Sequence, residues 1–236
     1  NPQLLEFVRS TTARILWLTG PAGYLDKPQV TDMLQRTEAR LVFVGRTHQE
    51  TYTGTGESST RNISPGVREE YREADEMDPS DPPTAIVTTH PKHGLEWLLD
   101  IWTTQVRAKV PNAELHIYSA AFSQADAGET LPDELNEIYL KVIAAEQSGV
   151  VIKAPAGDRD MSQAYRHARV HLYPGSEKEM YCSTLAESQA VGVPAVARPM
   201  GAVKERVIGD KSAFLTDGES DFAEGEDENF ECSKKK

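Results

Sequence analysis

The sequence is poor in several features that would each indicate a particular class of protein. It has two cysteines in 236 residues. These residues, Cys182 and Cys232, lack the spacing of a zinc site and are too few for a disulfide-stabilised domain. No hydrophobic run approaches the length of a membrane-spanning helix, and no signal peptide is recognisable. These absences favour a reducing compartment, and we expect a cytoplasmic protein without an integral membrane segment.

Basic residues are scarce as well. The 25 Lys and Arg stand against 37 Asp and Glu, which gives a net charge of −12. Because nucleic acids are bound by basic patches, this balance argues against a nucleic acid partner. Part of the acid excess is local, since eight acidic residues face three lysines from Asp217 onward. We expect residues 221–236 to form a disordered acidic tail.

The sequence also lacks a complete phosphate loop and an obvious metal site. The run Gly54-Thr55-Gly56 has neither the third glycine of G-x-G-x-x-G nor a Walker lysine, so a flexible loop is the better interpretation. Four histidines have no metal-ligand spacing, which favours packing or surface roles for them: His48, His116, His167 and His171.

The most informative stretch covers residues 173–205. A β-type run at 170–173 is followed by a polar loop and a short helix, with Ser183 as its expected N-cap and Gly192 just past its end. A second β-type run occupies 195–197. A strand, loop, helix and strand in this order build a parallel sheet, in which ligands bind at the carboxyl ends of the strands.

Two carboxylates flank the start of this helix, Glu179 in the loop and Glu187 in the first turns. The N–H groups of Cys182, Ser183 and Thr184 are expected to be free to bind an anion, which the helix dipole also favours. A diphosphate between two hydroxylated rings suits this layout, because each carboxylate can accept hydrogen bonds from ring hydroxyls. A nucleotide-sugar is such a ligand.

The spacing of the two carboxylates is not evidence by itself. With 23 Glu in the chain, about two pairs eight residues apart are expected by chance. Glu129 and Glu137 form such a pair on a charged amphipathic helix, where a solvated face explains them. The surrounding loop, helix start and glycine turn distinguish Glu179 and Glu187 from that pair.

Several blocks of the sequence carry a resemblance to a known family. The run E-M-Y-C-S-T-L-A-E-S-Q-A-V-G-V-P-A-V at 179–196 resembles the E-x7-E signature of retaining glycosyltransferases of family 4, which have the two-domain GT-B fold. G-A-V-K-E at 201–205 resembles the G-G-x-x-E turn that follows it. Residues 85–119 resemble the first β-α-β unit of the donor-binding domain, and 62–67 are similar to the interdomain segment I-P-N-G-V. The likeness covers roughly residues 40–217.

The resemblance implies an α/β fold of the GT-B type. We expect 1–60 to be a remnant of the N-terminal, Rossmann-like acceptor domain, 61–83 an interdomain linker, and 84–220 a Rossmann-like nucleotide-sugar-binding domain. The runs at 15–18 and 41–44 predict two buried parallel strands, with a helix near 28–36 between them. Because most acceptor-binding elements of the family are missing, we favour a fragment of a longer chain over a natural truncation.

The resemblance also implies roles for individual residues. Glu179 would bind the donor sugar hydroxyls and Glu187 the ribose hydroxyls, and Ser119 would lie close to the nucleotide. The family has an Arg or Lys immediately before the glycine that follows the first donor-domain strand. Here His93 takes that place beside Lys92, and both are candidates, with Glu179, for a catalytic role at the departing diphosphate. Further contacts with the donor are expected from the loop residues Met180, Tyr181, Cys182, Ser183 and Thr184.

These observations favour an enzyme that transfers a sugar from a nucleotide diphosphate sugar to a glycan, lipid or small-molecule acceptor, with retention of configuration. By the resemblance, it needs neither a metal nor another cofactor. One alternative is a non-catalytic module that binds the nucleotide-sugar but lacks the acceptor half, and a weaker one is an epimerase with the GT-B fold. Turnover with and without the upstream domain distinguishes the first two.

Overall fold

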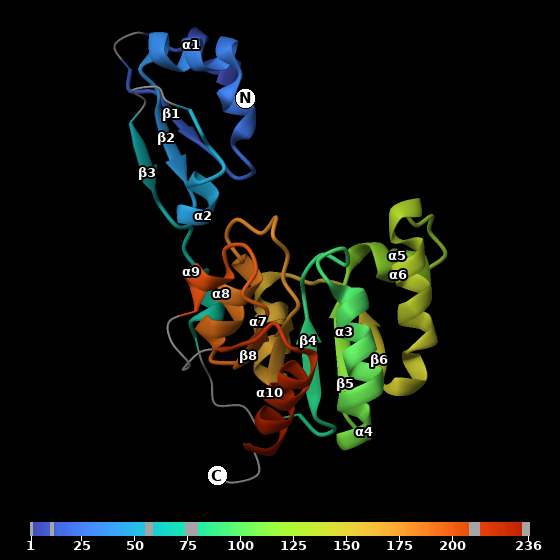
Figure 1. Cartoon of the computed structure of the whole chain (residues 1–236). Coiled ribbons are helices and arrows are strands. Elements are labelled where there is room, and N and C mark those ends of the chain that lie inside the picture. Colours follow the sequence, from blue (N-terminus) through green and yellow to red (C-terminus); the bar gives the residue numbers. More distant parts are fainter. Residues whose placement is uncertain (1, 10–11, 55–58, 74–79, 208–212, 233–236) are drawn as a thin grey trace.

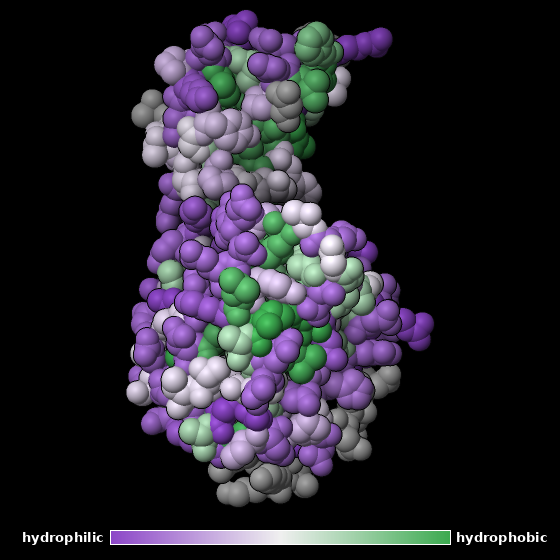
Figure 2. Space-filling view, turned by 90° about the vertical axis from the view of Figure 1, so that its right-hand side faces the viewer, coloured by the Kyte–Doolittle hydropathy of each residue, from purple (hydrophilic) through white to green (hydrophobic). Residues whose placement is uncertain are grey.

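The strands form two separate parallel sheets. The computed structural model describes residues 2–9, 12–54, 59–73, 80–207 and 213–232, the last seven of them by their backbone alone. Within these residues one sheet has three strands and the other has six. Figure 1 shows the smaller sheet and its helices above the larger one. In the space-filling view the two parts meet at a narrow waist (Figure 2). None of the described helices is long and apolar enough to cross a membrane.

The N-terminal unit contains the smaller sheet, in the order β1-β2-β3. Its strands are β1 (Ile15–Trp17), β2 (Arg40–Phe43) and β3 (Thr60–Asn62). Its helices are η1 (Pro2–Phe7), η2 (Gly23–Asp26), α1 (Pro28–Thr37) and α2 (Arg46–Gln49). The helix and the two parallel strands predicted here are confirmed. Proline suits the first helical position of α1, because its missing N–H would have no partner there.

The core of the N-terminal unit lies on one face of its sheet. Leu41 and Phe43 of β2 pack there against Leu25, Met33 and Leu34. The prediction that both strands are buried is wrong for β1, whose Ile15 and Trp17 are 60% and 54% exposed. β1 is an edge strand, and the helices of the unit that contribute to the core cover the opposite face. Its alternate side chains therefore face solvent.

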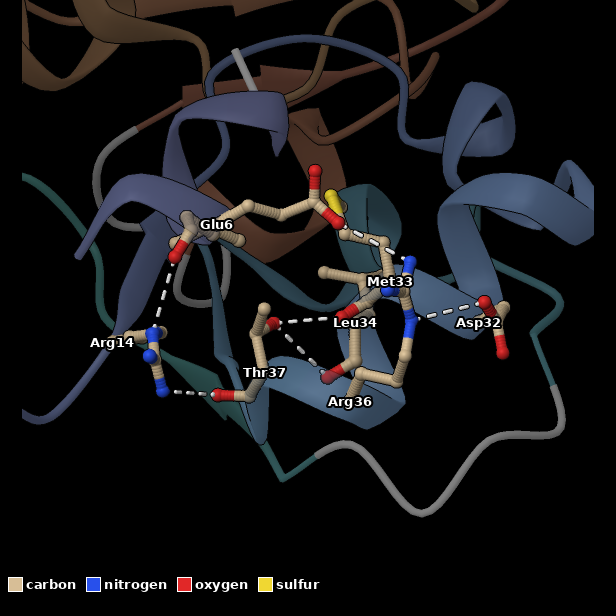
Figure 3. A network of polar contacts seen from close by, with 8 residues as sticks. Glu6, Arg14, Asp32, Met33, Leu34, Arg36 and Thr37 are labelled. Atoms are coloured by element: carbon tan, nitrogen blue, oxygen red, sulfur yellow. Dashed lines mark hydrogen bonds and ion pairs between the residues drawn. The ribbon is translucent and has the colours of Figure 1, made fainter. Parts of the chain in front are cut away.

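One arginine joins three segments of the N-terminal unit (Figure 3). The Arg14 guanidinium donates to the carbonyls of Leu5 (3.1 Å), Val8 (2.8 Å) and Thr37 (3.1 Å). Nearby, Arg36 pairs with Glu6 at 3.2 Å and with Asp32 at 3.1 Å. Arg14 satisfies carbonyls at the ends of η1 and α1 that would otherwise lack a partner.

The segment between the two sheets begins later than predicted. Arg61 and Asn62 belong to β3, because they pair with Val42 and Phe43, whereas the linker was expected to begin at 61. It contains a short helix, η3 (Glu69–Tyr71), whose Tyr71 is buried. Residues 74–79 of the predicted linker, and Thr55 and Gly56 of the predicted flexible loop, lie outside the described residues.

The larger sheet has the order β6-β5-β4-β7-β8-β9, with every pairing parallel. Its strands are β4 (Thr84–Val87), β5 (Glu114–Tyr118), β6 (Val150–Lys153), β7 (Val170–Tyr173), β8 (Ala195–Ala197) and β9 (Ala213–Leu215). The helical segments are α3 (Leu95–Ile101), η4 (Trp102–Val106), α4 (Arg107–Lys109), α5 (Ala120–Asp126), α6 (Asp133–Ala144), η5 (Glu146–Ser148), α7 (Asp158–His167), α8 (Ser183–Val191), α9 (Val203–Arg206) and α10 (Glu219–Cys232).

Helices cover both faces of this sheet, as continuous apolar strands require. Ala85 and Val87 face the layer of α3, η4, α6 and α10. Ile86, one residue between them, faces α7, α8 and η3. Apolar residues recur at helical spacing at Leu95, Leu98, Leu99, Trp102 and Val106, and residues 95–109 form α3, η4 and α4 in succession, with a π-helical turn at η4. These five apolar positions are all buried. The short elements α5, α9 and β9 were not predicted.

The prediction of a disordered tail from residue 221 is wrong up to Cys232, because α10 spans Glu219–Cys232. Phe222 and Ala223 are fully buried in the main core, and the Phe222 ring meets Trp97 edge-on at 4.9 Å. Figure 1 shows α10 lying along the sheet near α3. These two buried residues attach the acidic helix to the core. Residues 233–236 lie outside the described residues.

We expect Phe222→Ala to lower the free energy of unfolding by about 3–5 kcal/mol, because it leaves a cavity where α10 meets the core. The matched control is Phe7→Ala, since Phe7 is 84% exposed and its loss should change stability by less than about 0.5 kcal/mol. Urea denaturation measures both. Equal, small losses would contradict the packing of α10.

Candidate active site

The larger sheet has one position where its strand order reverses. From β4 the chain continues outward to β5 and β6 on one side of the sheet. From β7 it continues outward to β8 and β9 on the other side. In such doubly wound sheets, ligands bind in the crevice beyond the carboxyl ends of the two central strands. The segments that follow β4 and β7 contain His93 and Glu179. The fold therefore brings together residues that are far apart in the sequence.

Gly94 allows the two segments to approach closely. It has φ +84°, and a Cβ built on it would lie 3.0 Å from the Pro174 side chain. A residue with a side chain would be strained by the dihedral angle and crowded by the proline. The turn after β4 therefore packs directly against the end of β7.

His93 and Glu179 face each other across this crevice. The His93 Nδ1 lies 3.5 Å from the Glu179 Oε2, and both side chains are mostly buried. Lys92 is directed elsewhere, because its Nζ pairs with Glu134 on α6 at 2.7 Å. Of the two side chains predicted for this site, His93 therefore lies next to the Glu179 carboxylate. Lys92 is paired with Glu134 instead, outside the site.

The start of α8 differs from the prediction. Cys182, not Ser183, is the N-cap, and it adopts the left-handed conformation with φ 57° and ψ 55°. Its N–H donates to the Glu179 Oε1 at 3.2 Å, so one of the three predicted anion-binding N–H groups is already used. Ser183 and Thr184 are the first residues of the helix, where backbone N–H groups have no intrahelical acceptor. Burial raises the pKa of the Cys182 thiol to about 12, which keeps it neutral.

Glu187 lies on α8, and burial raises the pKa of its carboxyl to about 7. The negative Asp158 raises it further, and Arg68 acts in the opposite direction. Arg68 itself pairs with Asp158 at 2.8 Å, and the Tyr71 hydroxyl donates to Asp158 at 3.2 Å. Within the described residues the Glu187 carboxylate has no hydrogen-bond donor. It is a half-buried acceptor open to a ligand.

A buried polar chain beneath α8 was not predicted. Tyr165 donates to Thr88 at 2.9 Å, and Thr88 contacts the His171 Nε2 at 3.1 Å. The His171 Nδ1 lies 2.7 Å from the Ser188 hydroxyl, which donates to the Leu185 carbonyl at 3.0 Å. Burial lowers the pKa of His171 to about 3, so the ring is neutral. Because the Ser188 hydroxyl donates to Leu185, it accepts from the His171 ring. The ring proton is therefore on Nδ1, and Nε2 accepts from Thr88.

The chain of contacts fixes α8, which carries Glu187 next to Ser188. The earlier interpretation of His171 as a packing residue is correct as far as burial goes, but its hydrogen bonds connect β4, α7, β7 and α8. The sequence did contain a signal for this network, because a histidine buried within an apolar strand needs hydrogen-bond partners.

The remaining predicted residues have other contacts. The Ser119 hydroxyl accepts from the Phe122 N–H at 3.3 Å and so caps α5. The Tyr181 hydroxyl donates to the Pro65 carbonyl in the segment between the two sheets. Met180 faces the N-terminal unit, where its carbonyl would lie 3.7 Å from a Cβ on Gly45. In the described part of the chain, no group of three His, Cys, Asp or Glu side chains could hold a metal ion.

Comparison with known proteins gives a family and a fold. The family described as Glycosyl transferases group 1 matches residues 84–226. No curated protein matches the chain. Solved structures that resemble it include TarM, with a TM-score of 0.70 and 11% identity over 98% of this chain and 46% of that one. Alr3699/HepE from Anabaena in complex with UDP and glucose has a TM-score of 0.69 and 15% identity over 94% of this chain and 63% of that one.

Sucrose-phosphate synthase from Thermosynechococcus elongatus is also similar, with a TM-score of 0.68 and 13% identity over 94% of this chain and 59% of that one. At these identities the likeness establishes the fold, an α/β architecture with a Rossmann-like donor domain. The chain spans between 46% and 63% of the length of these three proteins.

The environment of Glu187 predicts a pH-dependent stability. Its folded pKa of about 7 exceeds the ordinary 4.5, so the folded state binds the proton more tightly than the unfolded state. Stability should therefore fall as the pH rises from about 4.5 to 7 and stay level above. Glu187→Gln removes this loss. After discounting for solvent screening, we expect its Tm to exceed that of the wild type by about 2–5 °C at pH 8 and by under 1 °C at pH 4.5.

The control is Glu137→Gln on the exposed face of α6, whose Tm should follow the wild type at both pH values. Thermal unfolding followed by circular dichroism gives all of these values. A Tm increase for Glu187→Gln that is the same at pH 4.5 and pH 8 would contradict the raised pKa.

Proposed function

The chain belongs to the family of glycosyl transferases group 1, and we propose that it is the donor-binding part of a retaining enzyme of family 4. The proposed enzyme transfers a sugar from a nucleotide diphosphate sugar to an acceptor. The observation that carries this proposal is the placement of three groups on the segments that follow β4 and β7, at the reversal of strand order. These are the His93–Glu179 pair at 3.5 Å, the start of α8, and the Glu187 carboxylate, which has no hydrogen-bond donor among the described residues.

Each group suits one part of a nucleotide diphosphate sugar. The first N–H groups of α8, at Ser183 and Thr184, bind the diphosphate with the help of the helix dipole. Glu187 accepts hydrogen bonds from the ribose hydroxyls, and the favourable hydrogen bonds offset the burial of its charge. Glu179 accepts from the sugar hydroxyls on the opposite side. One neighbour of the same fold, Alr3699/HepE, has been solved with UDP and glucose and with UDP-glucose, which supports UDP as the first nucleotide to test.

The residues at the leaving group indicate how transfer is assisted. As the bond between the sugar and the diphosphate breaks, negative charge grows on the phosphate oxygens. Fixed N–H donors of α8 stabilise this charge without reorganisation, and the His93 ring can donate a further hydrogen bond. We propose that this assistance requires no metal and that the protein works in the cytoplasm.

One observation favours the alternative of a non-catalytic nucleotide-sugar-binding module. Lys92 is engaged by Glu134 at 2.7 Å and His93 stands where the family has an Arg or Lys, so neither position directs a lysine or arginine to the diphosphate end. A site of this kind can still bind the nucleotide through backbone donors. Sugar release from the donor by the chain, with and without an added upstream domain, distinguishes binding from transfer.

We expect UDP to bind the chain and Glu187→Ala to weaken that binding about ten- to a hundredfold. Hydrogen bonds to a charged carboxylate are worth about 1.5–3 kcal/mol each. Calorimetric titration of UDP, GDP and their sugars measures this effect, with Glu137→Ala as the matched control. If the wild-type chain bound none of these nucleotides, the proposed function would be refuted.

The two candidate cations can be compared directly. His93→Ala should weaken UDP binding about three- to tenfold, because it removes the side chain nearest to Glu179 at the crevice. Lys92→Ala should change it by less than twofold, since Lys92 forms an exposed pair with Glu134. Titration at pH 6 gives both values. The reverse order would assign the diphosphate contact to Lys92.

A further inference from the structure

The four-residue helix α9 connects the two parts of the molecule. It follows Gly201, and its Val203 is fully buried in a cluster with Tyr173 and Leu185. The Ala202 N–H, just before the helix, donates to the carbonyl of Glu179 at 3.0 Å. The base of α9 is therefore fixed to the donor domain and to the loop that carries Glu179.

Glu205 of α9 forms hydrogen bonds with the backbone of the N-terminal unit. Its carboxylate accepts from the N–H of Arg46 at 2.8 Å and from the N–H of Thr47. A Cβ on Gly45 would lie 2.9 Å from the Glu205 Oε2, so the backbone turn at 45–47 closes around the carboxylate. Burial alone would raise the pKa of Glu205, but the hydrogen bonds from Thr47 and Arg46 outweigh it and lower the pKa.

Arg206, the next residue, contacts Tyr181 in the loop that leads to α8. Its guanidinium carbon lies 4.0 Å from the centre of the Tyr181 ring, and its Nε donates to the Tyr181 carbonyl at 2.8 Å. The Tyr181 hydroxyl donates to the Pro65 carbonyl in the segment between the sheets. Tyr181 immediately precedes Cys182, the N-cap of α8. The position of its backbone therefore helps to set where the first N–H groups of α8 point.

We propose that Glu205 and Arg206 are positioning residues through which α9 transmits the placement of the N-terminal unit to the donor loop at residues 179–184. Two adjacent residues on one helical turn cannot move independently. A shift of the unit at 45–47 moves Glu205, turns α9 and so displaces Arg206 and Tyr181. The inference deepens the proposed function and rests on it for the identity of the ligand, but the contacts themselves do not depend on the ligand.

Hydrogen–deuterium exchange of the full chain, without ligand, tests the transmission directly. Glu205→Ala should speed exchange about tenfold at residues 180–184, as well as at 45–47, and leave the strand at 114–118 unchanged. Arg206→Ala should speed exchange at 180–184. Arg206→Lys should resemble Arg206→Ala, because lysine keeps the charge but loses the planar face and the Nε–H. The double variant should not exceed the larger single effect, since the two residues act in series.

Titration with UDP provides the second measurement. Both single variants should bind UDP about three- to tenfold more weakly. Arg107→Ala is the matched control, since Arg107 also donates to a carbonyl, that of Ala113 at 2.8 Å. Ala113 precedes β5 and so lies at the amino end of the sheet, away from the crevice. This control should leave both UDP affinity and exchange at 180–184 as in the wild type.

The outcomes separate this inference from the proposed function. If Glu205→Ala affects exchange at 45–47 but not at 180–184, and UDP binding is intact, the transmission is refuted and the function stands. If the wild-type chain binds no nucleotide while exchange follows the expected pattern, the function fails and the positioning roles of Glu205 and Arg206 stand.

Discussion

The close backbone contact at Gly201 is the constraint on which the candidate site depends. At φ +52°, a Cβ on Gly201 would lie 2.6 Å from the Ser176 carbonyl and 2.7 Å from the Glu179 carbonyl. No L-residue with a side chain fits there without moving the loop. The absence of a side chain lets the loop after β7 lie directly on the turn after β8. Gly94 plays the same part on the other side of the loop, where it meets Pro174. Backbone packing thus holds the segments together without using the side chains of His93 and Glu187.

In the candidate site, a carboxylate whose burial lowers stability lies on a helix that rests on a hydrogen-bonded network. Glu187 is half-buried without a donor, and its raised pKa expresses that cost. Beneath it, the chain through Tyr165, Thr88, His171 and Ser188 gives each donor an acceptor. A satisfied buried network of this kind holds a helix in one orientation. In the proposed function, the stability lost at this carboxylate is the consequence of keeping a binding group in place.

Much of the donor domain could be predicted because its signals are local. Short apolar runs such as 170–173 and 195–197 coincide with β7 and β8, and the apolar spacing from Leu95 to Val106 predicts one buried helix face. The capping at Cys182 could not be predicted, because a cysteine in the left-handed conformation depends on its burial and on the Glu179 carboxylate. α10 was missed because two buried residues, Phe222 and Ala223, outweigh an acidic composition. The contact of Glu205 with Arg46 joins residues 159 positions apart, and no local pattern indicates it.

The charges around the crevice decide how an anionic ligand would be held. Three nearby nitrogen-bearing side chains already have partners: His93 lies by Glu179, Arg68 by Asp158, and Arg206 on Tyr181. A diphosphate would compete with Glu179 for His93, whereas the N–H groups of Ser183 and Thr184 have no such competitor among the described residues. Backbone donors act at hydrogen-bond distance, so salt screens them less than it screens exposed charges. In the proposed function, affinity would therefore depend on the orientation of α8 more than on the number of basic side chains, and the contacts that fix Tyr181 and Ser188 matter for that reason.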